Sequence, residues 1–431
     1  MKQQYDSYKP SGIDWIGDIP SHWKIQRLKF GMNLINGRAY LQPELLSEGK
    51  YRILRVGNFF TNDSWYYSDM ELEDNKYCSK GDLLYAWSAS IGPYIWNEEK
   101  VIFHYHIWKV GLSGKMDKKY SFYLLDVITK VKLNDMHGSA MQHLTMENMN
   151  NSDIIVPPLA EQEAIAAWLD EKCGEIDAAI AKVDREIELI DELKQSEISR
   201  VVTRGLNPDT PLRPSGIDWI DNIPLNWSSM KLKHTVKDIE TDFMDGDWIE
   251  STDISTEGIR YLTSGNIGAG YYKEQGEGFI SEETFAELNC IEVFPGDLLI
   301  SRLNEPIART CFIPDLGYRI VTCVDNVIYR PIGNLFDKRY IMYQLNCKPF
   351  WFNASQLSSG ATMQRISRSK LGAIKVLVPP LLEQQAIADY LDKKCAEIDG
   401  LKAKLSRKHE TLTELRQSII SEVVTGKRKV I

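Results

Sequence analysis

The chain has 431 residues, 43% of them apolar, with 20 Tyr, 11 Trp and a net charge of −9, which is enough for two or three domains with hydrophobic cores. It has no run of about 18 apolar residues and begins without an apolar stretch, so we expect neither a membrane span nor a secretory signal. Its seven cysteines form no Cys-x-x-Cys pair, which argues against structural zinc or a disulfide framework and favours a reducing, cytoplasmic location.

Two copies of one sequence unit follow each other along the chain. Residues 10–16 read Pro-Ser-Gly-Ile-Asp-Trp-Ile, and residues 214–220 read the same seven letters. Both copies then contain Arg-x-Leu-x-x-Gly-Asn, Gly-Asp-Leu-Leu, Gly-x-x-Met-Gln and Pro-Pro-Leu, while the sequences between these motifs differ. This pattern is typical of one scaffold that carries different functional loops. We predict a first globular domain at 1–159 that is followed by a long helix at 160–204. A linker at 205–213 then leads to a second globular domain at 214–381 and a second long helix at 382–431.

Each globular domain has the pattern of a mixed α/β fold. Short runs rich in β-branched and aromatic residues predict strands at 51–56, 83–87, 101–110, 297–301 and 321–329. Helices are predicted at 121–133, 145–149 and 338–345. The Gly-Asp pair before Leu-Leu predicts a turn that leads into a buried strand.

The two long segments have the spacing of paired helices. Acidic residues directly after Pro157-Pro158 are typical of a helix start, and Gly205 is a natural helix stop. Apolar residues recur every seven positions at Leu169, Ile176, Val183, Ile190, Leu391, Ile398, Leu405, Leu412 and Ile419. These heptads predict that the helices pair as an antiparallel coiled coil, which gives the chain internal pseudo-two-fold symmetry. The alternative is that each helix packs on its own domain or on another chain.

The charge balance differs between the two helices and is unfavourable for binding nucleic acid. Residues 161–204 carry 6 basic and 12 acidic side chains, whereas residues 383–431 carry 10 basic and 8 acidic ones. Opposite net charges of this kind are expected of two helices that pack against each other. Neither globular domain is basic overall, so any nucleic-acid footprint must be a local patch or be shared with another subunit. An acidic protein without a nucleic-acid partner explains this charge equally well.

The sequence contains only weak signs of catalytic or metal chemistry. Asp82 with Glu98-Glu99-Lys100 is similar to the Asp…Glu-x-Lys pattern of metal-dependent nucleases. The second copy keeps Asp297 but has no Glu-x-Lys, so a conformational role for Gly-Asp explains both copies and a nuclease explains only one. His104 and His106 alternate in a strand-like run without a suitable third ligand nearby, and we predict no metal site there.

Two sequence blocks carry a resemblance that covers essentially the whole chain. Each domain opens with Pro-Ser-Gly-Ile-Asp-Trp-Ile, followed by Ile-Pro, Trp and Leu-Lys, and each helix starts in Pro-Pro-Leu-x-Glu-Gln-x-Ala-Ile-Ala. With the long helices, these blocks resemble the DNA specificity subunit of type I restriction-modification systems. The resemblance implies two target recognition domains held apart by an antiparallel coiled coil. Each domain would read one half of a bipartite, asymmetric site on double-stranded DNA.

The resemblance also implies how catalysis is divided between subunits. The specificity subunit itself would have no catalytic activity and would hold no cofactor. Methyltransferase subunits would supply S-adenosylmethionine, and motor-nuclease subunits would supply ATP-driven cleavage with Mg²⁺. The net charge becomes less unfavourable if the methyltransferase subunits carry much of the phosphate contact.

Base recognition is expected from polar and basic residues near the repeated motifs. The candidates are Arg52, Arg55, Asn58, Ser139, Gln142, His143, Arg260, Ser264, Asn266, Arg302, Thr362, Gln364, Arg365 and Arg368. The repeated Gly-Asn and Met-Gln pairs could serve the scaffold or backbone contacts, so the divergent residues beside them are the preferred base readers. Three other functions stay open: a standalone DNA-binding regulator or architectural protein, a nuclease built on Asp82, and a coiled-coil adaptor that binds only proteins.

Overall fold

The structure is a computed structural model that describes residues 4–60, 62–135, 144–360 and 363–430. The chain forms two compact units, which we name unit 1 (residues 1–184 and 407–431) and unit 2 (residues 185–406). Both long helices cross this division, so each unit contains one globular domain and a part of each helix. Among the residues described, no helix is both long enough and apolar enough to cross a membrane.

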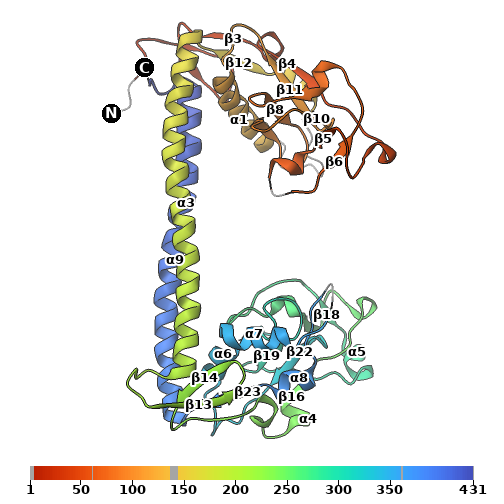
Figure 1. Cartoon of the computed structure of the whole chain (residues 1–431), viewed down its shortest axis with the longest axis vertical. Helices are drawn as coiled ribbons and strands as arrows, with labels where there is room; N and C mark the ends of the chain where they lie inside the picture. The colour runs from red at the N-terminus through yellow and green to blue at the C-terminus, as the bar shows by residue number, and fades with distance from the viewer. Residues whose placement is uncertain (1–3, 61, 136–143, 361–362, 431) are drawn as a thin grey trace. The chain divides into compact units, whose positions relative to one another are not determined.

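The globular domain of unit 1 contains two four-stranded sheets (Figure 1). The first is antiparallel, in the order β4 (Met32–Asn36), β11 (Ile107–Leu112), β8 (Leu83–Ala86), β9 (Gly92–Ile95). The second has the order β6 (Tyr66–Ser68), β5 (Tyr51–Leu54), β10 (Val101–Phe103), β7 (Tyr77–Cys78), with β5 and β10 parallel. The other elements are β1 (Tyr8–Pro10) with β2 (Asp18–Pro20), β3 (Lys24–Arg27) with β12 (Asp153–Val156), α1 (Lys118–Asp135) and α2 (Met146–Asn150).

The globular domain of unit 2 repeats this arrangement. Its antiparallel sheet has the order β16 (Phe243–Asp245), β22 (Asn326–Tyr329), β19 (Leu298–Ser301), β20 (Thr310–Phe312). Its second sheet has the order β18 (Phe279–Ile280), β17 (Ile259–Leu262), β21 (Ile320–Thr322), with β17 and β21 parallel. The other elements are β13 (Leu212–Ile217) with β14 (Ile220–Pro224), β15 (Ser228–Lys231) with β23 (Lys375–Val378), α4 (Ile239–Asp242), α5 (Glu282–Glu287), α6 (Lys338–Leu345), α7 (Lys348–Gln356) and α8 (Arg368–Ala373). The strand order is the same in both domains except that the second sheet has four strands in unit 1 and three in unit 2, and this likeness follows from the repeated sequence.

The predictions of single strands at 101–110 and 321–329 are wrong. Each segment contains two strands separated by a turn, at residues 104–106 in unit 1 and 323–325 in unit 2. The turn is needed because β10 pairs in parallel with β5, whereas β11 belongs to the antiparallel sheet. A glycine lets another segment approach each turn closely. A Cβ on Gly37 would overlap the carbonyl of His104, and a Cβ on Gly246 would overlap the carbonyl of Thr322. The other predicted strands and helices agree with β5, β8, β19, α1, α2 and α6 to within three residues at each end.

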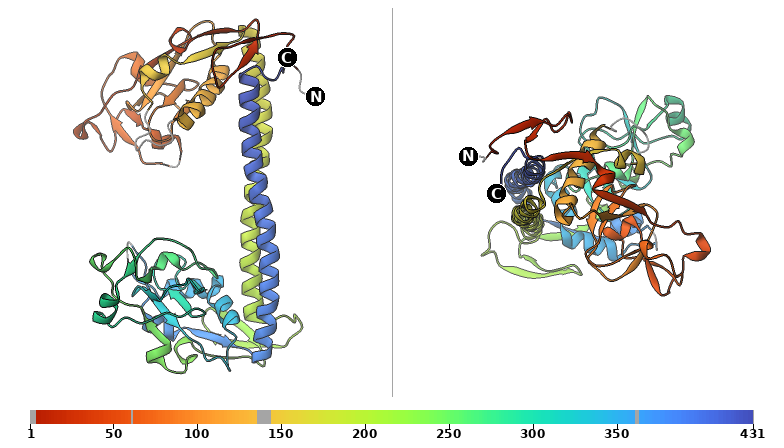
Figure 2. Two further views of the ribbon diagram at one scale, coloured as in Figure 1. Left: turned by 180° about the vertical axis from the view of Figure 1, so that it is seen from behind. Right: turned by 90° about the horizontal axis from the view of Figure 1, so that it is seen from above.

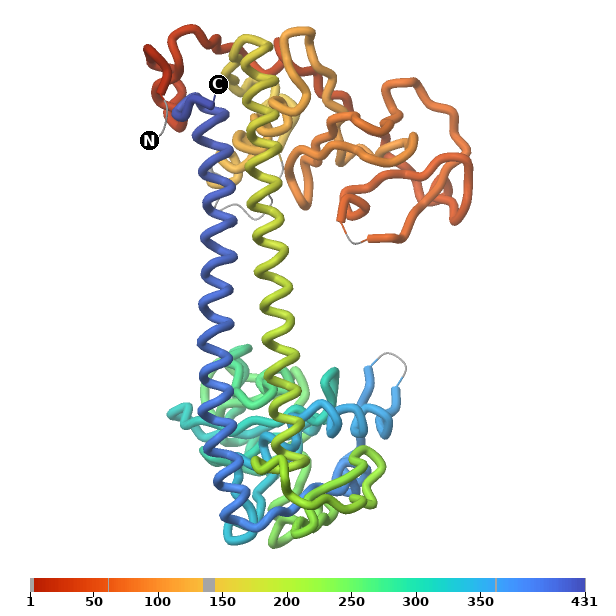
Figure 3. Tube along the Cα trace, turned by 60° about the vertical axis from the view of Figure 1, so that its left-hand side comes forward, coloured from red at the N-terminus to blue at the C-terminus, as the bar shows by residue number. Residues whose placement is uncertain are grey.

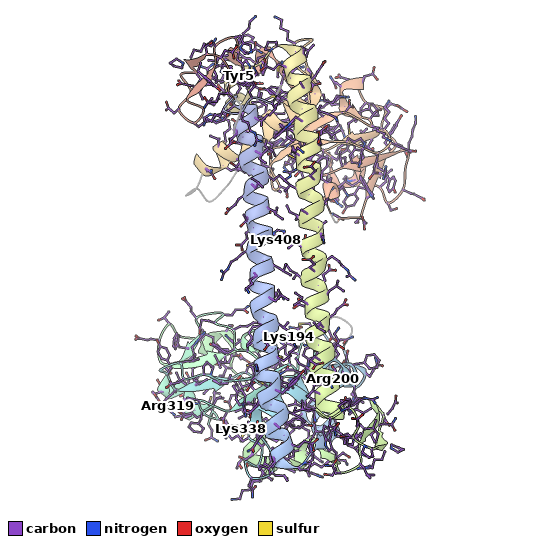
Figure 4. All side chains as sticks on the ribbon, turned by 90° about the vertical axis from the view of Figure 1, so that its left-hand side faces the viewer. Tyr5, Lys194, Arg200, Arg319, Lys338 and Lys408 are labelled. Carbon is purple, nitrogen blue, oxygen red and sulfur yellow. The ribbon has the colours of Figure 1, made fainter. Side chains whose placement is uncertain are left out.

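The long helices α3 (Leu159–Arg204) and α9 (Leu381–Val424) pack together in both units (Figures 1–3). Three ion pairs connect them: Asp177–Arg416 at 2.8 Å in unit 1, and Asp191–Lys402 and Lys194–Asp399, both at 2.7 Å, in unit 2. In unit 1 the Asp184 carboxylate also lies 3.4 Å from the His409 ring nitrogen. Lys194 is labelled on α3 in Figure 4. As the residue number rises along α3, the partner number falls along α9, so the two helices run in opposite directions.

The heptad positions lie on the shielded side of each helix. Five of the nine are buried, namely Leu169, Ile176, Val183, Leu391 and Ile398, and the other four are half-buried. By contrast, Leu193 on α3 is 55% exposed and Leu401 on α9 is 50% exposed. The spacing of seven therefore separates covered leucines and isoleucines from those that face solvent.

The C-terminal end of α9 packs into the globular core of unit 1, and the C-terminal end of α3 packs into the globular core of unit 2. In unit 1, Ile420, Val423 and Val424 of α9 belong to the same hydrophobic cluster as α1. The Tyr120 hydroxyl donates to the Val424 carbonyl at 3.4 Å. In unit 2, α3 contributes Ile198, Val201 and Val202 in the same way. Here the Tyr340 hydroxyl donates to the Val202 carbonyl at 3.2 Å.

The repeated Pro-Pro-Leu-x-Glu-Gln motif fixes where each helix leaves its domain. The fully buried Gln162 amide donates to the carbonyls of Pro157 and Lys115, both at 2.9 Å, and its oxygen accepts from the Asp117 N–H. Gln384 makes the equivalent bonds in unit 2, to Pro379, Leu335 and Asp337. A buried amide whose groups are all bonded costs little to bury and defines one geometry.

Candidate nucleic-acid interface

The repeated Gly-Asn pair supports a loop in both units. The Asn58 side chain accepts from the Arg55 N–H and donates to the carbonyls of Asn62 and Ser64. Asn266, which is buried, accepts from the Thr263 N–H at 2.9 Å and donates to Lys273 and Gln275. These amides hold the short 3₁₀ turns at Val56–Phe59 and Ser264–Asn266 in shape.

Arg52 and Arg260 occupy matching positions on β5 and β17 but have different surroundings. Arg52 is half-buried, lies over the Trp65 ring at 4.6 Å and pairs with Glu98 at 2.9 Å. Arg260 is only 4% exposed and donates to the carbonyls of Gly276 and Gly278, with Glu274 at 3.1 Å. Arg260 therefore braces the loop that leads into β18.

Arg55 lines a pocket of about 380 Å³ in unit 1 together with Tyr40, Asn62, His104 and His106, among others. The Arg55 guanidinium lies 4.4 Å from the Tyr66 ring centre. Burial, with His106 and Arg55 nearby, lowers the pKa of His104 to about 4. The histidines belong to the turn between β10 and β11 and not to one strand face, which corrects the interpretation made from the sequence.

Three of the candidate arginines meet in unit 2. Arg302, Arg365 and Arg368 surround two carboxylates: Arg302 lies 3.1 Å and Arg368 3.5 Å from Asp245, and Arg365 lies 2.9 Å from Asp325. We name these five residues the arginine–aspartate cluster. Burial raises the pKa of Asp245, although the three arginines act in the opposite direction. Arg302 is buried, whereas the side chains of Arg365 and Arg368 are 40% and 43% exposed.

The remaining candidates divide into described and undescribed residues. Ser264 is half-buried, and its carbonyl accepts from the buried Arg309 at 3.0 Å. Gln364 is exposed, and its side-chain oxygen accepts from the hydroxyls of Ser355 and Ser358 at 3.3 and 3.4 Å. Ser139, Gln142, His143 and Thr362 lie outside the described residues.

Two backbone hydrogen bonds define the position of the arginine–aspartate cluster and recur in unit 1. In unit 2, the Arg302 N–H donates to the Asp325 carbonyl at 2.8 Å, and the Ile366 N–H donates to the Arg302 carbonyl at 3.0 Å. In unit 1, the Trp87 N–H donates to His106 at 3.1 Å, and the Leu144 N–H donates to Trp87 at 3.4 Å. Trp87 and His106 therefore stand where unit 2 has Arg302 and Asp325.

The matching position in unit 1 is aromatic. The Trp87 ring lies 5.1 Å from the His106 ring and 6.0 Å from the Tyr105 ring, and His104 lies 4.8 Å from His106. We name these four residues the aromatic cluster. Sequence reasoning missed Trp87, Tyr105, Asp245 and Asp325 as site residues. Trp87 ended a predicted strand, and Tyr105 and Asp325 lay inside predicted strands that had to turn, whereas no predicted strand contained Asp245.

The residues of the nuclease alternative have structural partners. Asp82 accepts from the Ser79 N–H at 2.8 Å and pairs with Lys109 at 2.7 Å. Asp297 does the same with the Phe294 N–H at 3.0 Å and with Arg330 at 2.7 Å. Both aspartates thus shape the turn before a buried strand. Among the described residues, no group of three or more His, Cys, Asp and Glu side chains is placed to hold a metal ion.

Comparison with known proteins gives consistent matches over most of the chain. The family model described as Type I restriction modification DNA specificity domain matches twice, at residues 20–188 and 236–407. The type I restriction enzyme MjaVIII specificity subunit of Methanocaldococcus jannaschii is 24% identical over 424 residues, covering 96% of this chain and 94% of that protein. The EcoBI specificity subunit of Escherichia coli is 20% identical over 422 residues, covering 96% and 88%.

A solved structure has the same fold. It is described as "Structural basis underlying complex assembly and conformational transition of the type I R-M system" and aligns with a TM-score of 0.67 at 16% sequence identity. The alignment covers 94% of this chain and 98% of that chain.

Proposed function

Because this chain belongs to the type I restriction-modification DNA specificity family, we propose that each of its globular domains reads one half of a bipartite, asymmetric DNA site. The observation that carries the proposal is that the two globular domains share one fold but have different side chains at the same position. The arginine–aspartate cluster of unit 2 and the aromatic cluster of unit 1 occupy the same place in the same fold. Two readers of the same chemistry would favour a symmetric site, whereas two different readers favour an asymmetric one.

In this proposal, α3 and α9 form an antiparallel coiled coil that sets the spacing of the two half-sites and docks methyltransferase subunits. Ion pairs in one consistent register and the shielded heptad positions support the coiled coil. The repeated domain–helix order supports pseudo-two-fold symmetry. Reading heads on one face of B-DNA must meet major grooves about 34 Å apart or a multiple of that, and a stiff helix pair can fix such a distance.

The chain itself would be non-catalytic. Methyltransferase subunits would bring S-adenosylmethionine, and motor-nuclease subunits would bring ATP and Mg²⁺. The net charge of −9 supports a division in which the partner subunits supply much of the contact with DNA phosphates. The buried or paired state of Asp82 and Asp297 removes the main reason for proposing a nuclease centre here.

The test is selection from a randomised duplex DNA library by the full chain assembled with its methyltransferase subunits. We expect two short preferred sequences separated by an unread gap of fixed length. Replacing the globular domain of unit 2 with that of a relative should change one preferred sequence and leave the other and the gap unchanged. A complex that enriches no sequence, or a replacement that changes both halves, would refute the proposal.

A further inference from the structure

The arginine–aspartate cluster of unit 2 holds one arginine in a fixed place at the surface. Arg365 Nε lies 2.9 Å from Asp325 Oδ1, and the Arg365 side chain is 40% exposed against 25% for Asp325. The two charged groups are in contact, but Asp325 Oδ1 accepts no hydrogen bond from the described residues, so the pairing attracts the guanidinium without setting the direction of its two terminal nitrogens. Those terminal nitrogens have the parallel geometry that binds two acceptors at once.

The backbone around Arg365 is fixed from two sides. Arg365 forms β-bridges with Leu303 and Ser359, and its N–H and carbonyl both bond to Ser359 at 3.0 Å. The buried Arg302 connects the neighbouring segments, since its guanidinium donates to the carbonyls of Val324 and Ile366. Backbone bonds also join Arg302 to Asp325 and to Ile366, so both segments are held against Arg302. A side chain that is oriented before binding loses less conformational entropy when it meets its ligand.

Guanine is the base that suits such a reader. It presents O6 and N7 as two acceptors in the major groove, and a bidentate arginine is the commonest specific contact to it. Adenine presents one acceptor and one donor there, so a guanidinium cannot bond to it in the same way. The partner carboxylate also reduces the positive charge of the cluster, which weakens attraction to phosphates of any sequence.

The aromatic cluster of unit 1 has different chemistry at the corresponding place. His106 stands in the place of Asp325, and Trp87 in the place of Arg302. The position thus offers imidazole and indole rings where unit 2 offers a guanidinium and carboxylates. A guanine preference that arises from the arginine–aspartate cluster therefore belongs to one half-site only.

We propose, resting on the proposed function, that Arg365 is the base-reading residue of unit 2, that Asp325 positions it, and that the second half-site contains a guanine read in the major groove. Arg302 acts as a buried support of both. Arg368, which donates to the Phe243 carbonyl at 3.2 Å and lies against Asp245, completes the support from α8.

The experiment uses the full chain with its methyltransferase subunits and a randomised duplex DNA library. The parent is compared with Arg365→Gln, Arg365→Ala and Asp325→Asn. Arg319→Gln is the matched control, because Arg319 is a 42% exposed arginine of unit 2 that also pairs with a carboxylate, Glu292 at 3.0 Å. Thermal unfolding of every variant is measured in parallel to confirm that each one folds.

We expect the parent to require guanine at one position of one half-site. Arg365→Ala should reduce that preference roughly tenfold to a hundredfold, and Arg365→Gln should move it toward adenine, which glutamine binds through N6 and N7. Asp325→Asn should weaken preference at the same position only, and Arg319→Gln should leave it unchanged. The first half-site should stay the same throughout.

Two results would overturn the inference, and they are distinguishable from failure of the proposed function. If Arg365→Ala keeps the guanine preference, another residue reads the base. If it weakens binding to all sequences alike, Arg365 contacts phosphate. A parent complex that enriches no sequence at all refutes the proposed function, and this inference with it.

Discussion

At the scale of single residues, the repeated polar side chains support the fold, and the divergent ones form the surfaces that differ between the domains. Asn58 and Asn266 hold the same loop, and Gln162 and Gln384 hold the same helix start. Residue type alone could not separate the buried Arg260 and Arg302 from the exposed Arg365 and Arg368. Burial depends on which segments meet in space, and the sequence pattern contains no record of that.

Replacing Asn266 should destabilise unit 2 more than replacing Asn58 destabilises unit 1. Asn266→Ala leaves the Thr263 N–H and the Lys273 carbonyl without their partner at a buried side-chain position, at a cost of about 2–3 kcal/mol, while Gln275 keeps a bond from Arg260. Asn58 is half-buried, so water can replace its bonds and the loss should stay near 1 kcal/mol. Urea unfolding of both variants measures the difference, and equal losses would contradict this account of burial.

His104 should make the stability of unit 1 sensitive to acid. Its pKa in the folded chain is about 4, below the ordinary value, so the unfolded state binds a proton first as the pH falls. The stabilisation is fully present above about pH 6.5 and is lost as the pH falls toward 4. We expect a loss of about 1–2 kcal/mol, less than for full burial because the ring is partly exposed.

The measurement is the free energy of unfolding between pH 4 and pH 7.5 for the parent and His104→Asn. The variant should lose less stability than the parent across this range, because it has no imidazole to protonate. His234→Asn, at an exposed histidine of unit 2, serves as a control. Parallel pH curves for the parent and His104→Asn would show that burial of His104 has no effect on the acid stability.

At the scale of elements, regular spacing was predictable and changes of direction were not. The heptads and the Pro-Pro-Leu motif predicted long helices where α3 and α9 lie, because seven-residue spacing reports directly on one face of a helix, although α9 ends at Val424 and not at residue 431. The runs at 101–110 and 321–329 are rich in apolar and β-branched residues and contain no glycine or proline, so they predict one strand each. The turns arise from tertiary structure, where they pass close to Gly37 and Gly246, directly after β4 and β16. The missed site residues at 104–106 and 323–325 lie in these same turns.

Charges placed in the heptad positions should disrupt helix packing. Ile176→Asp buries a carboxylate at a position that is 9% exposed, and Leu405→Asp does so at a half-buried one, at a cost of several kcal/mol. Leu193→Asp is the matched control, since Leu193 on α3 is 55% exposed. Circular dichroism melting and co-purification with methyltransferase subunits measure the effect. If both buried variants match Leu193→Asp, the two helices do not stabilise each other as proposed.

At the scale of the whole molecule, the ends of the two long helices carry the same residue types. The α3 end has Ile198, Val201, Val202 and Thr203, and the α9 end has the same residue types at Ile420, Val423, Val424 and Thr425. Each set is buried against the tyrosine of a globular domain, Tyr340 or Tyr120. The end of α3 therefore carries the side chains that the core of unit 1 requires.

A fragment of residues 1–206 should form a homodimer in which each copy supplies its α3 end to the other. Gly205, with a φ of 75°, is retained so that the helix can end as it does in the full chain. The dimer should dissociate on dilution and tighten with salt, because residues 161–204 carry twice as many acidic as basic side chains. Analytical ultracentrifugation at several concentrations and salt levels measures this.

The expected functional result is recognition of an inverted repeat of the first half-site by the fragment with methyltransferase subunits. Val201→Asp in the fragment should prevent dimerisation, because Val201 is fully buried in unit 2 and its counterpart Val423 is fully buried in unit 1. A fragment that stays monomeric at high concentration would show that the helix ends are not interchangeable.

The closing of each core by a distant helix end has a consequence for the order of synthesis. The ribosome completes the globular sequence of unit 1 before it makes Ile420, Val423 and Val424, which belong to that core. The domain made first is therefore finished last. During translation the uncovered part of the unit 1 core can accept the α9 end of a second nascent chain on the same messenger RNA. The timing of synthesis as well as the sequence therefore decides which helix end completes the core.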